Sequence, residues 1–174
     1  MAAPTMSQPA AEDAAEGGPF EIVRRPAPAG LEDLVIDMTG YREHGLLPVR
    51  QVEAASLTVP LIVGFGEPFE IALSREPGPG DRFGSFAAGL CAGPALIRSG
   101  GAAHCMQVNF TPPGAFRFFG RPMRDLADRL VGIDDLEDAQ LRALRERLGG
   151  AEDWNARFAL LETLLRARLG QGRP

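Results

Sequence analysis

The chain has no lysine, few cysteines and few histidines. All 18 basic residues are arginines, and Cys and His occur only twice each among 174 residues. We attribute the missing lysine to coding bias, so the number of arginines does not by itself indicate phosphate binding. Two cysteines, Cys91 and Cys105, cannot build the disulfide framework of a small secreted domain. We therefore expect two reduced thiols.

Long apolar runs and a strong charge imbalance are missing as well. No segment reaches the ~18 consecutive apolar residues of a membrane-spanning helix. Residues 1–19 lack both the basic start and the apolar core of a secretory signal. A net charge of −5 predicts no general attraction to nucleic acid or to an anionic membrane. These absences predict a cytoplasmic protein with no membrane partner and a disordered leader at 1–19.

Residues 20–110 have the pattern of an all-β segment. Within short runs, apolar and polar residues alternate at period two, and Gly, Pro and Asp separate the runs. The run LTVPLIVGF at 57–65 looks like one arm of a hairpin, which GEP turns into FEIAL at 69–73. A tight turn at 99–101 joins the runs 94–98 and 103–110. Six or seven short strands in about 90 residues predict a sandwich or a barrel, because an open sheet would leave their apolar faces bare.

Helical signals begin at Thr111. Thr111 followed by prolines predicts a capped helix start, and Gly120 predicts its end. The run PMRDLADRL at 122–130 has apolar residues at helical spacing, and DAQLRALRERLGG at 138–150 ends on a glycine stop signal. The sequence thus predicts an α+β fold in which a helical segment of three to four helices at 111–169 follows the β-rich domain, with a short tail at 170–174.

The last predicted helix has an apolar stripe. Its residues are spaced by 4, 3 and 4 positions, which is the seam of a short coiled coil or helix bundle: Trp154, Phe158, Leu161 and Leu165. The stripe either packs on the preceding helices of the same chain or contacts a second chain in a homodimer. Spacing alone leaves both arrangements open.

No catalytic constellation is visible. His44 and His104 are far apart, and His104, Cys105 and Met106 cannot converge on a metal because adjacent strand residues point to opposite faces. The sequence has no nucleophile elbow, phosphate-binding loop or C-x-x-C motif. We expect no enzyme activity, no catalytic residues, no metal and no cofactor.

A small ligand pocket is compatible with the sequence. A barrel with apolar inward faces holds a small molecule if side chains fill it incompletely. The candidate lining residues are Phe65, Arg98, Met106, Gln107, Val108 and Asn109. Arg98, Gln107 and Asn109 supply polar contacts if they face inward, and the pattern equally allows them to face solvent.

Several motifs occur in a fixed order along residues 55–169. They comprise Gly89 and Leu90; Val108, Phe110, Thr111, Pro112, Gly114 and Ala115; Gly120, Pro122 and Met123; and Trp154, Arg157, Phe158 and Leu161. In this order and spacing the chain resembles the N-terminal half of a group of AraC-family transcriptional regulators. Cys91 departs from the pattern, since relatives often have His or another polar residue there.

The resemblance implies a cupin-like, jelly-roll-like domain that senses a small-molecule effector, and helices that dimerise. DNA binding then resides in a C-terminal domain of two helix-turn-helix motifs, for which GQGRP after Leu169 leaves no room. Two alternatives remain: a stand-alone decoy that heterodimerises with longer regulators, and a free-standing cupin-like small-molecule-binding protein or enzyme.

Overall fold

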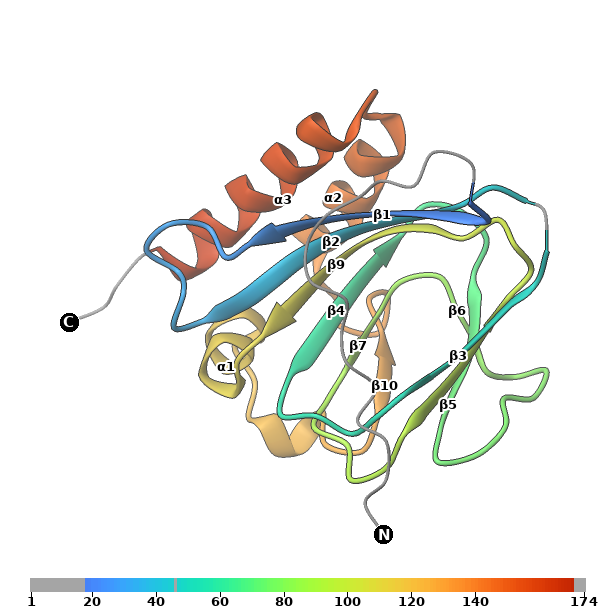
Figure 1. Ribbon diagram of the computed structural model, residues 1–174. Helices are drawn as coiled ribbons and strands as arrows, with labels where there is room; N and C mark the ends of the chain where they lie inside the picture. The colour runs from blue at the N-terminus through green and yellow to red at the C-terminus, as the bar shows by residue number, and fades with distance from the viewer. Residues whose placement is uncertain (1–17, 46, 171–174) are drawn as a thin grey trace, which may run out of the picture.

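The chain folds into two antiparallel sheets and a layer of helices (Figure 1). The structure is a computed structural model that describes residues 18–45 and 47–170. The six-stranded sheet contains, in spatial order, β1 (Phe20–Pro26), β2 (Val35–Glu43), β9 (His104–Phe110), β4 (Val59–Gly64), β7 (Phe86–Ala88) and β10 (Leu130–Gly132). The four-stranded sheet contains β3 (Val49–Glu53), β8 (Ala95–Ser99), β5 (Phe69–Leu73) and β6 (Arg82–Phe83).

The α+β class is confirmed, but the strands do not close into a barrel. Each sheet ends on edge strands, and no pairing between described strands joins the two sheets. The edges that lie towards the same side, β6 and β10, have only two and three residues and are too short to continue a ladder. The predicted leader and tail fall almost wholly outside the described residues.

Several connections between consecutive strands cross from one sheet to the other, whereas β1 and β2, and β5 and β6, pair within one sheet. The predicted hairpin at 57–73 is wrong, because β4 pairs with β9 and β7 whereas β5 pairs with β8 and β6. The turn at 99–101 likewise carries the chain from β8 in one sheet to β9 in the other. Local alternation predicts the strands β4, β5, β8 and β9. It does not say which strands pair with each other, because pairing depends on residues far away in the sequence.

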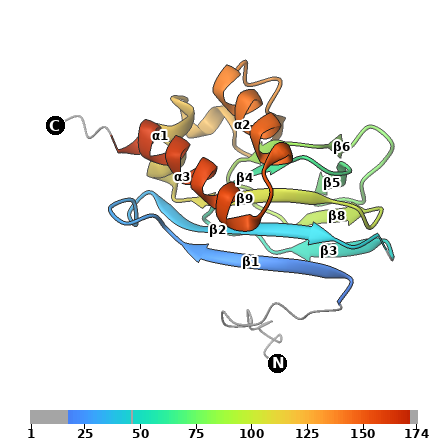
Figure 2. The same cartoon turned by 90° about the horizontal axis from the view of Figure 1, so that it is seen from above.

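The six-stranded sheet is the middle layer of the molecule (Figure 2). On one face, Leu61, Met106 and Val108 belong to a core shared with the helices. On the other face, Ile62 and Cys105 belong to a second core with Phe69 and Ile71 of the four-stranded sheet and their neighbours. Because both faces are covered, β4 is apolar on both sides rather than strictly alternating.

Three α-helices cover the outer face of the six-stranded sheet: α1 (Pro112–Phe119), α2 (Ala139–Gly150) and α3 (Trp154–Leu169). The predicted start and end of α1 are confirmed, since Thr111 accepts a hydrogen bond from the Gly114 N–H and Gly120 adopts the left-handed conformation, φ 62°. Asp138 and Asp153 cap the other two helices in the same way as Thr111. No helix among the described residues is both long and apolar enough to span a bilayer.

The helix predicted at 122–130 is absent. Residues Met123–Asp125 form one 3₁₀ turn, and the chain then extends into β10. The reason is tertiary: the Gly89 N–H donates to the Arg129 carbonyl and the Asp128 N–H donates to the Leu90 carbonyl. Gly89 permits this contact, because a Cβ there would lie 1.7 Å from the Leu126 carbonyl oxygen. Pairing with β7 outweighs the local helical periodicity.

Candidate functional site

Two of the predicted pocket residues face the space between the sheets. Gln107 lies directly opposite Ile62 in the ladder, and Ile62 belongs to the core between the sheets. Gln107 donates to the Asn109 Oδ1 at 2.9 Å, and Asn109 donates to the Asp37 Oδ1 at 2.7 Å. All three side chains are half-buried. They form a polar row on the inner face of the six-stranded sheet.

The other predicted pocket residues lie elsewhere. Met106 and Val108 alternate with Gln107 and are therefore buried on the opposite face, under the helices, where Phe65 also packs. Arg98 lies opposite Glu70 and points away from the inter-sheet core. It lines a shallow hollow of about 440 Å³ on the outer face of the four-stranded sheet.

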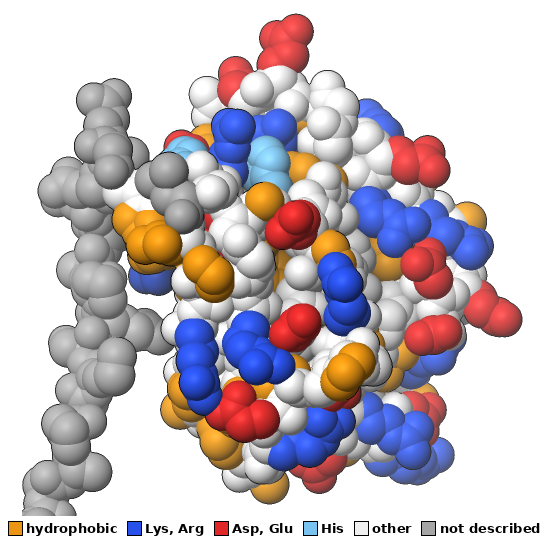
Figure 3. All heavy atoms as spheres, turned by 90° about the vertical axis from the view of Figure 1, so that its right-hand side faces the viewer, with side chains coloured by type: hydrophobic (Ala, Val, Ile, Leu, Met, Phe, Trp, Pro, Cys, Tyr) orange, Lys and Arg blue, Asp and Glu red, His pale blue; other side chains and the backbone are white. Residues whose placement is uncertain are grey.

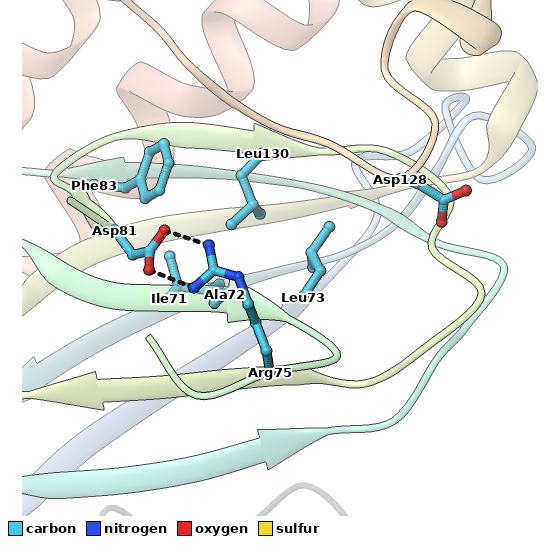
Figure 4. Close-up of a pocket in the computed structure, with 8 residues that line it drawn as sticks. All are labelled: Ile71, Ala72, Leu73, Arg75, Asp81, Phe83, Asp128 and Leu130. Carbon is cyan, nitrogen blue, oxygen red and sulfur yellow. Dashed lines mark hydrogen bonds and ion pairs between the residues drawn. The ribbon is translucent and has the colours of Figure 1, made fainter. Parts of the chain in front are cut away.

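A cleft opens between the two sheets at the edge where they fail to close (Figure 4). It has a volume of about 300 Å³. Its apolar residues come from β5, β6 and β10 and its charged residues from the flanking loops, and polar atoms make up the larger part of the exposed lining. The lining residues are Ile71, Ala72, Leu73, Arg75, Asp81, Phe83, Asp128 and Leu130. None of the predicted pocket residues lines it.

An ion pair between two residues of the loop 75–81 lies at the cleft. Arg75 donates from Nη1 to the Asp81 Oδ2 at 2.6 Å and from Nη2 to the Asp81 Oδ1 at 2.8 Å. These bonds and the Gly78 N–H, which also donates to Asp81, hold the pKa of Asp81 down at about 2. The side chain of Asp81 is one fifth exposed and that of Arg75 is 61% exposed. The pair therefore fixes the loop 75–81 while it leaves part of the guanidinium accessible at the cleft.

Asp128 lines the far end of the cleft in Figure 4. It adopts a positive φ of 52°, and its Oδ1 accepts a hydrogen bond from the Ala92 N–H at 3.0 Å. Burial, followed by the charge of Asp128, raises the pKa of the nearby Cys91 thiol. Cys91 is therefore a protonated thiol at neutral pH.

Searches against family models, curated proteins and solved structures found no match.

His104 belongs to an aromatic cluster on the helix side. Its ring centroid lies 4.3 Å from that of Phe65 and 5.3 Å from that of Trp154. Burial, and then the positive charges of Arg157 and Arg42, lower the pKa of His104 to about 4. The imidazole is neutral at pH 7, and Cys105 points to the other face of β9, as strand alternation predicts. Among the described residues, no group of three or more His, Cys, Asp or Glu side chains is placed to hold a metal ion.

The stripe of α3 is covered within the chain. Phe158, Leu161 and Leu165 are fully buried in the core under the helices, and Trp154 is half-buried against Gly40. The Trp154 Nε1–H donates to the Glu21 Oε1 at 2.8 Å. Phe158, Leu161 and Leu165 therefore offer no free face to a second chain, and Trp154 keeps only part of its surface exposed.

Sequence reasoning missed the cleft residues. Asp81 lies in EPGPGDRFG at 76–84, which has the composition of an ordinary surface loop, and Arg75 directly precedes it. Asp128 lies in the run 122–130, for which the spacing predicts a helix. The only local signal is the Gly/Pro-rich loop bracketed by opposite charges. Charged side chains of both signs also intermingle on the described part of the face seen in Figure 3, with no large patch of one sign.

Proposed function

We propose that this chain is the effector-sensing and dimerisation domain of an AraC-type transcriptional regulator with a cupin-like jelly roll. In this proposal it acts in the cytoplasm, and a separate helix-turn-helix domain contacts DNA. The observation that carries the proposal is the cleft between the two sheets. The ordered motifs from Gly89 to Leu161, which include the Thr111 junction, support the same assignment.

The cleft has the chemistry of a small-molecule site. Its volume of about 300 Å³ suits a small organic ligand. Leu73, Phe83 and Leu130 supply apolar contact area, and Arg75 supplies N–H groups beyond those bound to Asp81. The charged groups of the cleft orient a ligand, and its apolar side chains add contact area.

Ligand binding is tested by a thermal-shift screen of small organic compounds on three proteins. These are the wild type, Leu73→Trp, which fills the cleft, and Val52→Trp, which places the same ring on an exposed strand of the same sheet. We expect compounds that raise the Tm of the wild type and of Val52→Trp but not that of Leu73→Trp. Compounds that stabilise all three proteins equally would place binding outside the cleft.

The regulatory role is tested by fusing the chain to a DNA-binding headpiece that represses a reporter only as a dimer. We expect the fusion to repress, and a compound from the screen to change the repression. A fusion that is expressed and folded but leaves the reporter fully active would contradict the dimerisation role.

A further inference from the structure

Among the described strands, β1 is the longest one at a sheet edge. It has seven residues, whereas the other edge strands β3, β6 and β10 have five, two and three. Among the described residues, no strand pairs with the side of β1 that faces away from β2. A long unpaired edge presents a row of N–H and C=O groups to another strand. The fold therefore provides a ready interface for an added strand.

The sequence of β1, FEIVRRP, is complementary to itself when read antiparallel. We propose that a second copy of this chain pairs along β1 in the antiparallel sense, with Val23 on the twofold axis. All seven residues are then paired, and Glu21 of each copy lies opposite Arg25 of the other. A twofold ladder gives both ion pairs at once, because the two halves of the interface are identical.

Neighbouring registers are less favourable. A twofold axis perpendicular to the sheet must pass through a residue, because residues directly opposite each other share one face. Centring on Arg24 places two arginines opposite each other, which is unfavourable. Centring on Ile22 places Glu21 opposite Val23 and leaves Arg25 unpaired. Charge complementarity therefore selects Val23.

The charged side chains of β1 are already held in place by α3. Glu21 accepts from the Trp154 Nε1 through one oxygen, which leaves its second oxygen available. Arg25 donates to Asn155, and its guanidinium carbon lies 4.3 Å from the centre of the Phe158 ring. Both groups lie on the helix side of β1, so the ion pairs form next to the start of α3 without reordering long side chains.

The paired edges would join the two six-stranded sheets into one continuous sheet. The α3 helices of both copies, which run along β1 and β2 in Figures 1 and 2, then lie on the same face on either side of the seam. On the opposite face Phe20, 37% exposed, lies opposite the partner's Pro26 and loses part of that exposure. Dimerisation thus uses an edge strand and not the buried stripe of α3.

This inference rests on the dimerisation part of the proposed function. Charge reversal in β1 tests the β1 interface separately from dimerisation itself. Sedimentation of the wild type should give twice the chain mass of 18.6 kDa. Glu21→Arg and Arg25→Glu each place like charges opposite each other and should weaken the dimer roughly tenfold or more. The double variant Glu21→Arg/Arg25→Glu restores opposite charges and should recover dimerisation. Glu146→Arg, an exposed reversal on α2, is the matched control and should leave the dimer unchanged.

A cross-link tests the register without relying on the charged pair. Val23→Cys places two thiols at the twofold axis, where mild oxidation should give a covalent dimer. Val52→Cys, on the edge strand of the other sheet, and the wild type with Cys91 and Cys105 should stay largely monomeric on a non-reducing gel. A wild type that sediments as a monomer at about 100 μM, in the affinity range of weak complexes, would overturn both the interface and the dimerisation role. A dimer that resists both single charge reversals and does not cross-link at Val23→Cys would overturn the interface alone.

Discussion

Arg157 is the residue whose removal most directly tests how the helix layer is held together. It is 9% exposed, and it donates from Nε to the Leu148 carbonyl at 3.2 Å and from Nη2 to the Ala151 carbonyl at 2.7 Å. Leu148 lies in the last turn of α2, where its carbonyl also accepts from the Ala151 N–H at 3.3 Å, and Ala151 directly follows the helix. The guanidinium also lies 5.1 Å from the Trp154 ring and 5.3 Å from the Phe65 ring. One side chain of α3 therefore caps α2 and closes the aromatic cluster.

The substitution Arg157→Met keeps the length and the apolar stem but removes both hydrogen bonds. Bonds that involve a charged group contribute about 1.5–3 kcal/mol each, and water can partly replace the bond to the half-buried Ala151. We therefore expect a loss of ~3 kcal/mol in the free energy of unfolding. For a chain of this size that corresponds to a fall in Tm of roughly 6–12 °C.

The assay is urea unfolding followed by far-ultraviolet circular dichroism. Trp154 is the only tryptophan and lies beside the substitution, so its fluorescence would mix local and global changes. Arg166→Met is the control, because Arg166 is exposed and binds Glu162 and the Ala29 carbonyl at the surface. We expect that control to lose less than ~1 kcal/mol. Equal losses in the two variants would refute the capping role of Arg157.

Three further predictions concern His104, Gly89 and Phe158. The folded state lowers the pKa of His104 from 6.5 to about 4, so unfolding takes up a proton between these values and stability falls as the pH drops through this window. After discounting for the partial exposure of His104, the expected loss in the free energy of unfolding is ~1–2 kcal/mol. Urea titrations at a series of pH values should show this loss in the wild type and not in His104→Gln. Gly89→Ala should lower the free energy of unfolding by at least ~2 kcal/mol, because the new Cβ meets the Leu126 carbonyl. Gly80→Ala is the control, since its Cβ points into open space. An unchanged Tm of Gly89→Ala would contradict this contact. Phe158→Ala should cost ~3–5 kcal/mol in the same unfolding assay, and a loss below ~1 kcal/mol would show that the ring is not part of the core.

Local chemistry explains which elements were predictable. The cap at Thr111, the left-handed Gly120 and the periodic leucines of α2 act within a few residues, so the sequence alone predicts these helices. The alternation of β9 is also local. In contrast, the helix predicted at 122–130 lost to backbone pairing with β7, which depends on the contact at Gly89.

The candidate site was harder to predict for the same reason. Gln107 and Val108 differ by one position, yet one faces the second sheet and the other faces the helices. The strand order decides which face of β9 packs on the helices and which face packs on the second sheet, and strand order is a long-range property. The cleft itself exists because β6 and β10 are short, and its charged residues lie in loops whose approach no periodicity encodes.

The central position of β9 has a mechanical consequence. Its alternate side chains touch two different layers, Met106 and Val108 the helices and Cys105 the opposite sheet, while its neighbours are β2 and β4. Close-packed interiors do not absorb displacements the way a liquid does. A small molecule that separates the two sheets and displaces β9 would therefore also displace the helices packed on its other face.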